Sequence, residues 1–302
     1  MLLFLEQLLN GLQYGVMLFL MAAGLTLIFG IMGVINLAHG SLFMVGAYAA
    51  ATVAGRTGSF ALAAVGALAA AGCTGALIEL LVIRRLYDRD HLDQVLATFG
   101  LLLFFNELMA TLAGRTPLFM QPPPWLAGAV EIIPGVPYPM FRLAILVTGL
   151  AVGAGLAFLI TRTRLGMLIR AGATHRDIVG ALGVDIRLLF TLVFGLGALL
   201  AGLAGLMAAP IIAVQVGMGE QILIATFVVI VIGGLGSVRG ALVGALLVGL
   251  VDTLARAFVP GLLKQVFAAT TADALGAGIA SAAIYLLMAL VLVLRPRGLL
   301  PA

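Results

Sequence analysis

The sequence predicts an all-α fold, a polytopic bundle of membrane-spanning helices. Of its 302 residues, 63% are hydrophobic and only 9% are charged, whereas about one quarter of the residues of a soluble domain are charged. The apolar residues form runs long enough to cross a bilayer as helices, which takes about 20 residues. Because lipid satisfies no backbone hydrogen bonds, such runs must be helices rather than open sheet. The 39 glycines fit this class, since small residues let membrane helices approach closely.

The apolar runs predict about nine spans, within a range of about eight to ten. We expect residues 1–302 to form a single transmembrane domain. The runs lie near residues 12–34, 40–54, 60–83, 94–112, 142–160, 188–209, 221–235, 240–257 and 277–294.

Basic residues predict the orientation, because cytoplasmic loops carry an excess of Arg and Lys. Of the 16 Lys and Arg residues, 11 share one side if loops 84–93 and 161–187, the turn 236–240 and the tail lie together. We expect that side, with the C-terminus, to be cytoplasmic. Nine spans place the N-terminus outside, and a first segment made of two short spans would place it inside. The five remaining basic residues are Arg56, Arg115, Arg142, Arg256 and Lys264.

The longest outer connection runs from Ala113 to Phe141 and holds seven of the 11 prolines. Proline does not continue a helix, and Trp125 favours the membrane interface. We interpret this segment as a connector along the outer headgroups, with docking of an external partner as the alternative.

Two Gly-rich breaks interrupt the apolar runs, one from Phe29 to Ser41 and one from Ile232 to Ala241. Paired interruptions suggest an internal repeat with a pathway at its interface. A broken helix offers free N–H groups to a carboxylate. Alternatively, His39 caps a helix end and the glycines only allow tight helix crossing. The candidate path or gate residues in the breaks are Asn36, His39, Gly40, Gly233, Gly234, Gly236 and Ser237.

Asn106 and Glu107 are further candidates for the pathway, because an ionisable residue within a membrane span indicates function by default. Glu107 either faces the pathway or pairs with Arg115 near the outer surface. Glu79 lies five residues before Arg84, and a local ion pair accounts for it without a function.

An enzyme is not expected. The chain has three histidines and one cysteine, and no Ser/His/Asp spacing, His-Glu-x-x-His or Gly-x-Ser-x-Gly motif. The second break lacks the Gly-Lys-Ser/Thr ending of a phosphate loop. We therefore expect no metal and no cofactor, and a net charge of +4 is too small to indicate nucleic acid binding.

The segment 161–187 is a basic island between two apolar runs. Thr174 and Asp177 have the spacing of a capping box, which predicts a short helix from Arg176 to Leu182. We interpret the island as a cytoplasmic coupling loop that docks a soluble subunit. The alternative is an ordinary positive-inside loop.

Several motifs together resemble those of the permease subunit of branched-chain amino acid ABC importers, the first of two paired permeases. They are Gly30-Ile-Met-Gly-Val-Ile-Asn-Leu-Ala-His-Gly40, Gly46-Ala-Tyr48, Thr163-Arg-Leu-Gly-Met-Leu-Ile-Arg-Ala171, Ala181-Leu-Gly183, Gly233-Gly-Leu-Gly-Ser-Val-Arg-Gly-Ala241 and Arg295-Pro-Arg-Gly298.

The resemblance implies a multi-pass subunit of the bacterial inner membrane that moves Leu, Ile or Val through the lipid bilayer. Its implied partners are a second homologous permease, two cytoplasmic ABC ATPases that hydrolyse ATP and a periplasmic solute-binding protein. The residues that it implies in ATPase coupling are Arg164, Gly166, Arg170, Ala171, Arg176, Asp177, Ala181 and Gly183.

Two alternatives stay open. Similar permeases serve urea, short amides or other small solutes. An ion-coupled secondary transporter or channel belongs to another class and would need paired acids or a polar ion site inside the membrane.

Overall fold

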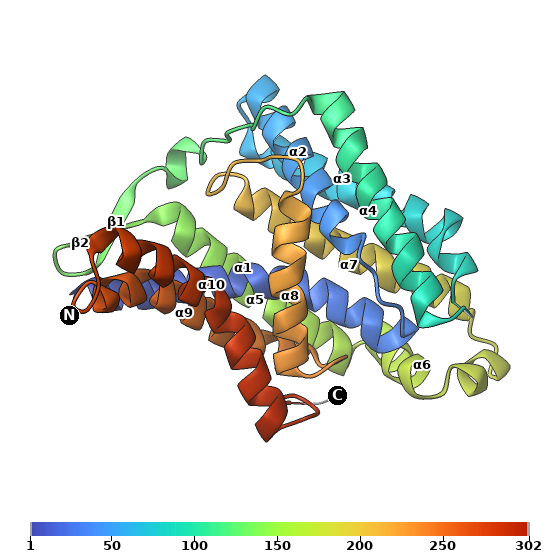
Figure 1. Ribbon diagram of the computed structural model, residues 1–302. Coiled ribbons are helices and arrows are strands. Elements are labelled where there is room, and N and C mark those ends of the chain that lie inside the picture. Colours follow the sequence, from blue (N-terminus) through green and yellow to red (C-terminus); the bar gives the residue numbers. More distant parts are fainter. Residues whose placement is uncertain (1, 88, 301–302) are drawn as a thin grey trace. The chain divides into compact units, whose positions relative to one another are not determined.

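The computed structural model describes residues 2–87 and 89–300, without the side chains of residue 133 and residues 175–177. Helices dominate it, with one small antiparallel hairpin (Figure 1). In chain order the elements are α1 (Leu2–Met32), α2 (His39–Thr57), α3 (Phe60–Leu81), α4 (His91–Ala113), β1 (Ala129–Ile133), β2 (Val136–Pro139), α5 (Met140–Arg162), α6 (Arg164–Ala181), α7 (Ile186–Ala208), α8 (Met218–Gly233), α9 (Val238–Leu263) and α10 (Ala269–Leu294), with 3₁₀ turns at Ile83–Arg85 and Pro124–Leu126.

The predicted polytopic helical bundle is confirmed. In the described part of the chain, 7 helices are long and apolar enough to cross a membrane: α1, α3, α4, α5, α7, α9 and α10. The less apolar α2 and the shorter α8, of 16 residues, account for the two remaining predicted runs. α2 follows the first Gly-rich break, and α8 precedes the second.

The prediction for the start of the island helix was wrong. α6 begins at Arg164, because the Thr163 hydroxyl accepts a hydrogen bond from the Gly166 N–H at 3.0 Å and caps the helix there. Thr174 lies in the middle of α6, where its hydroxyl donates to the Arg170 carbonyl at 3.0 Å instead of capping a new helix. The island is therefore one helix of 18 residues.

One compact unit comprises residues 23–123 and 151–224. Within it α2, α3 and α7 pack against one another. A Cβ placed on Gly46 would lie 2.6 Å from Gly202 Cα, and one on Gly75 would lie 2.4 Å from Ala198 Cβ. Small residues thus bring these three helices into backbone contact, as expected for helices that pack in lipid.

The other unit comprises residues 1–22, 124–150 and 225–302. Here α9 packs against α10, and α1 crosses α9. A Cβ placed on Gly249 would lie 2.4 Å from the Gly15 nitrogen. The β1–β2 hairpin belongs to this unit and pairs Ala129 with Pro139, so the connection from Ala113 to Phe141 is partly ordered as sheet.

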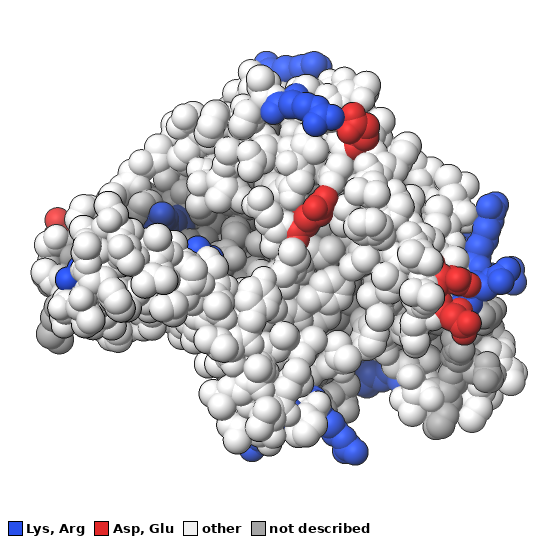
Figure 2. Space-filling view, viewed as in Figure 1, with Lys and Arg blue, Asp and Glu red and all other residues white. Residues whose placement is uncertain are grey.

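The surface carries many large apolar side chains. Most of the face in Figure 2 is uncharged, and the Lys and Arg side chains gather in small groups. On α3, Leu62, Val65 and Leu77 are all more than half exposed. Apolar patches of this extent indicate contact with lipid or with other subunits.

Candidate functional site

α1 and α2 are separated by a break inside the bundle. Gly33, with φ +67°, ends α1, and its N–H donates to the Phe29 carbonyl at 2.9 Å. The chain then runs to His39, where α2 starts. A Cβ on Gly24 would lie 3.1 Å from the His39 ring. Gly24 lies about 12 Å along the helix axis before the end of α1. The start of α2 therefore lies beside α1 and not beyond its end.

The start of α8 meets the start of α2. A Cβ on Gly40 would lie 2.4 Å from the Gly219 carbonyl oxygen, and one on Gly219 would lie 2.2 Å from the Gly40 carbonyl oxygen. Only glycine fits at either position. The contact brings together two helix N-termini, each of which carries a partial positive charge. Some of their N–H groups already donate to the preceding turn, as Ser41 does to the Ala38 carbonyl at 3.0 Å and Glu220 to the Gly217 carbonyl at 3.1 Å.

Polar side chains are buried around this contact. Asn36 is 0% exposed, His39 is 0% exposed and Ser41 is 2% exposed. Within the described residues, both amide atoms of Asn36 and the Ser41 hydroxyl have no hydrogen-bond partner. Each such group costs about 1–3 kcal/mol when it is left unpaired. The first break is therefore a polar site inside an apolar bundle.

Glu220 adds an acidic group to the site. It lies in the first turn of α8, directly after Gly219, and its carboxylate accepts a hydrogen bond from the Asn106 amide of α4. Glu107, the next residue along α4, has a different partner. Glu107 pairs with Arg115 at 3.1 Å, and both side chains are more than 70% exposed.

The second break, between α8 and α9, forms a tight turn in the other unit. Gly234 and Gly236 have φ values of +109° and +82°, and the Ser237 hydroxyl caps α9 by accepting the Gly240 N–H at 3.0 Å. A Cβ on Gly233 would lie 2.3 Å from the Gly240 carbonyl oxygen. The glycines thus permit close backbone contact on both sides of the turn.

The C-terminal tail folds back onto this turn. The N–H groups of Leu299 and Leu300 donate to the carbonyls of Ile232 and Gly233, both at 2.9 Å. These are carbonyls of the last turn of α8, which have no partner within the helix. The tail therefore completes the end of α8.

α6 leaves α5 through a sharp elbow. A Cβ on Gly166 would lie 2.1 Å from the Leu159 carbonyl oxygen. Farther along, Ile169 and Val179 are buried, and Gly172 lies against Leu189 of α7. α6 thus packs against the protein on one side, while its Arg164 and Arg170 side chains stay exposed.

The exposed side of α6 carries several of the predicted coupling residues. Arg164, Arg170, Ala181 and Gly183 are exposed, Ala171 is half-buried and Gly166 is buried. Arg176 and Asp177 belong to the helix, but their side chains lie outside the described residues.

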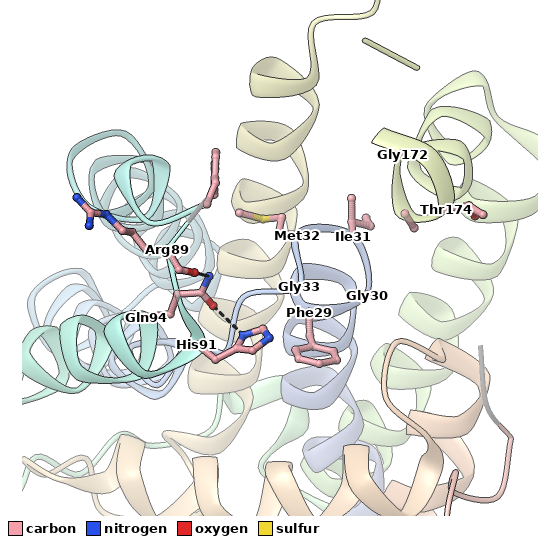
Figure 3. Close-up of a pocket in the computed structure, with 12 residues that line it drawn as sticks. Phe29, Gly30, Ile31, Met32, Gly33, Arg89, His91, Gln94, Gly172 and Thr174 are labelled. Carbon is pink, nitrogen blue, oxygen red and sulfur yellow. Dashed lines mark hydrogen bonds between the residues drawn. The ribbon is translucent and has the colours of Figure 1, made fainter. Parts of the chain in front are cut away.

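A pocket of about 480 Å³ lies between the end of α1, the start of α4 and α6 (Figure 3). Phe29 and Gly33 line it from α1, and Gly172 and Thr174 from α6. At the α4 side, Gln94 donates to the carbonyls of Leu86 and Arg89, both at 3.1 Å. The shared pocket places the end of α1, the start of α4 and the middle of α6 at the same end of this unit.

A buried carboxylate joins α3 to α7 near this pocket. Glu79 is 0% exposed and accepts hydrogen bonds from Arg84, from the Thr191 hydroxyl at 2.9 Å and from Tyr87. Burial raises the pKa of the Tyr87 hydroxyl well above its usual range, and the hydrogen bond to Glu79 raises it further. Tyr87 therefore stays protonated and donates. The predicted ion pair of Glu79 with Arg84 is confirmed as part of a larger network.

The permease component of branched-chain amino acid transport systems is the family whose pattern matches this chain, over residues 7–294. The chain belongs to this family.

Similar curated proteins cover nearly the whole permease. It is 30% identical to the high-affinity branched-chain amino acid transport system permease protein BraD of Pseudomonas aeruginosa and 28% identical to LivH of Escherichia coli strain K12, in each case over 98% of this chain and 95% of the relative. A probable LivH of Methanocaldococcus jannaschii is 27% identical over 80% of this chain and 78% of the relative. No solved structure matches the chain.

The permease brings together only some of the residues predicted for the path. Asn36, His39 and Gly40 share one site, and Asn106 reaches it through Glu220. Glu107 takes the alternative that the sequence left open, the pair with Arg115. Gly233, Gly234, Gly236 and Ser237 form the second turn in the other unit. Their roles in translocation stay predictions.

Two elements of the permease were missed from its sequence. Glu220 stands alone at the start of an apolar run, and only the contact of Gly40 with Gly219 reveals its surroundings. The contact of the tail with the second break was also missed, although both motifs carried the family resemblance. Both motifs stand among those that carry the family resemblance, and this was the signal that could have suggested their contact.

Proposed function

We propose that this chain is a pore-forming subunit of an ATP-driven importer that moves leucine, isoleucine or valine across the bacterial inner membrane. The observation that carries the proposal is the full-length membership of the permease family, and the names of its relatives supply the substrate class. The break before α2 and the polar, buried start of that helix support a translocation role, because irregular backbone inside a membrane occurs where it lines a pathway.

The chain works with separate motor subunits in this proposal. Its partners are a second homologous permease, two cytoplasmic ATPases and a periplasmic solute-binding protein. ATP hydrolysis takes place in the ATPases, and α6 receives their motion. The exposed Arg164 and Arg170 support docking, and the tight elbow at Gly166 makes α6 move together with α5.

The orientation follows from the basic side. We place α6, the α3–α4 connection and the C-terminal tail in the cytoplasm, because they hold most of the Arg residues. The common pocket of Phe29, Tyr87 and Thr174 supports this assignment for one unit, since these segments share one end of it.

The test is purification of the chain from its native membrane, identification of the proteins that come with it, and reconstitution in liposomes. Recovery of an ATPase and a second permease, together with leucine uptake that requires ATP and the binding protein, supports the importer. Uptake by the chain alone under an ion gradient, without ATP, would instead establish a secondary transporter. ATP-driven uptake of urea or an amide, but not of leucine, would correct the substrate.

A further inference from the structure

Two helix starts converge within the membrane-spanning part of one unit. α2 and α8 touch through Gly40 and Gly219, and α2 has no side-chain cap. Both helices direct their partial positive charge toward this contact. A helix start inside the bundle attracts a negatively charged group such as a carboxylate.

A second and independent observation points to a ligand at the same place. Asn36 stands just before α2 and Ser41 in its first turn, and both are more than nine-tenths buried. The amide nitrogen of Asn36 and the hydroxyl of Ser41 have no partner among the described residues. They are hydrogen-bond donors of the kind that a carboxylate takes up.

The opposite charge is also present. Glu220 follows Gly219 directly, so its carboxylate lies one residue from the contact between the two helices. One of its oxygens accepts the Asn106 amide. A carboxylate has about four lone-pair positions, so Glu220 retains room for an ammonium group.

The wall beside these groups is apolar. The Cβ of Leu223 would lie 3.3 Å from a Cβ on Gly40, and Met218 and Ile222 are buried in the same helix. An apolar side chain therefore meets apolar surroundings next to a donor cluster and an acid. Urea and simple amides carry neither a carboxylate nor an ammonium group.

We propose that the starts of α2 and α8 form a binding site for a zwitterionic α-amino acid with an apolar side chain. The α-carboxylate binds at the start of α2 with Asn36 and Ser41, and the α-ammonium group pairs with Glu220. The site is closed in this conformation, because Asn36 is 0% exposed, so entry requires the two helix starts to separate. This assignment rests on the proposed function and names the substrate contacts within it.

The test uses the complete importer in liposomes, with ATP inside and saturating leucine-loaded binding protein outside. Glu220→Gln and Ser41→Ala should each lower the rate of leucine uptake about tenfold or more, as expected for loss of a hydrogen bond to a charged group. Glu220→Asp should restore part of the rate. Asp273→Asn, which neutralises an acid in an exposed pair with Lys264, should transport like the unaltered protein.

A second measurement separates a binding role from a folding defect. In the importer without binding protein, L-leucine should raise the midpoint of thermal unfolding, whereas leucinamide and 4-methylpentanoate, which lack one charged group each, should not. Ser41→Ala and Glu220→Gln should assemble with their partners and lose most of the leucine effect. Unaltered leucine uptake in both variants would overturn the site and leave the proposed function intact. Absence of ATP-driven leucine uptake by the unaltered importer would overturn the proposed function itself.

Discussion

Glu79 and Arg84 are joined by two hydrogen bonds of 3.2 Å each, which link both oxygens of a fully buried carboxylate to one guanidinium group. Thr191 of α7 binds the same carboxylate. The carboxylate that pairs with a residue close in sequence therefore also holds α3 against α7.

Glu79→Ala should destabilise the permease by about 3 kcal/mol, because it leaves several buried donors without their acceptor. The measurement is thermal unfolding of the purified complex in detergent. Glu107→Ala is the matched control, since its pair with Arg115 is exposed and such pairs contribute about 0–1 kcal/mol. Equal losses in the two variants would contradict the importance of the buried network.

Gly40→Ala should prevent the contact of α2 with α8, because the new methyl group would lie 2.4 Å from a backbone oxygen. We expect a loss of about 2 kcal/mol or more in stability, as for overpacked cores, together with a loss of transport. Gly55→Ala lies in the same helix and has open space around it. It should be neutral or stabilising by about 0.5–1 kcal/mol. Similar unfolding midpoints for both variants would argue against the close contact.

Arg170→Glu should weaken binding of the ATPase, because it reverses a charge on the exposed face of α6. Co-purification of the ATPase should fall about tenfold, which corresponds to about 1.4 kcal/mol. Arg115→Glu, on the opposite side of the predicted membrane, serves as the control and should retain the ATPase. Full recovery of the ATPase with Arg170→Glu would show that α6 is not the main docking surface.

The orientation can be measured with single cysteines. After Cys73→Ser, the chain has no other cysteine. Thr174→Cys should react with an impermeant maleimide only in inside-out vesicles, and Thr116→Cys only in right-side-out cells. Both positions are exposed. Labelling of Thr174→Cys from the outside would reverse the assigned topology.

Hydropathy predicted the spans well, because a run of apolar residues must be buried in lipid whatever its partners are. The start of α6 was mispredicted. Thr174 has the spacing of a capping box with Asp177, but the helix begins earlier, where the Thr163 hydroxyl accepts the Gly166 N–H and Gly166 packs against Leu159.

Only part of the candidate site could be predicted from the sequence. Asn36 and Gly40 stand in a recognisable break, and Asn106 is a polar residue within an apolar run. Glu220 is separated from Asn106 by 114 positions, so their pairing depends on tertiary packing that no local pattern encodes. The contact of the C-terminal tail with α8 likewise depends on tertiary packing.

The crossing of α1 and α9 at Gly15 and Gly249 has a consequence for biosynthesis. During synthesis α1 acquires this neighbour only after more than two hundred further residues have been made. During that interval the surface of α1 around Gly15 lacks this partner. A premature stop ahead of α9 therefore removes a helix against which α1 packs.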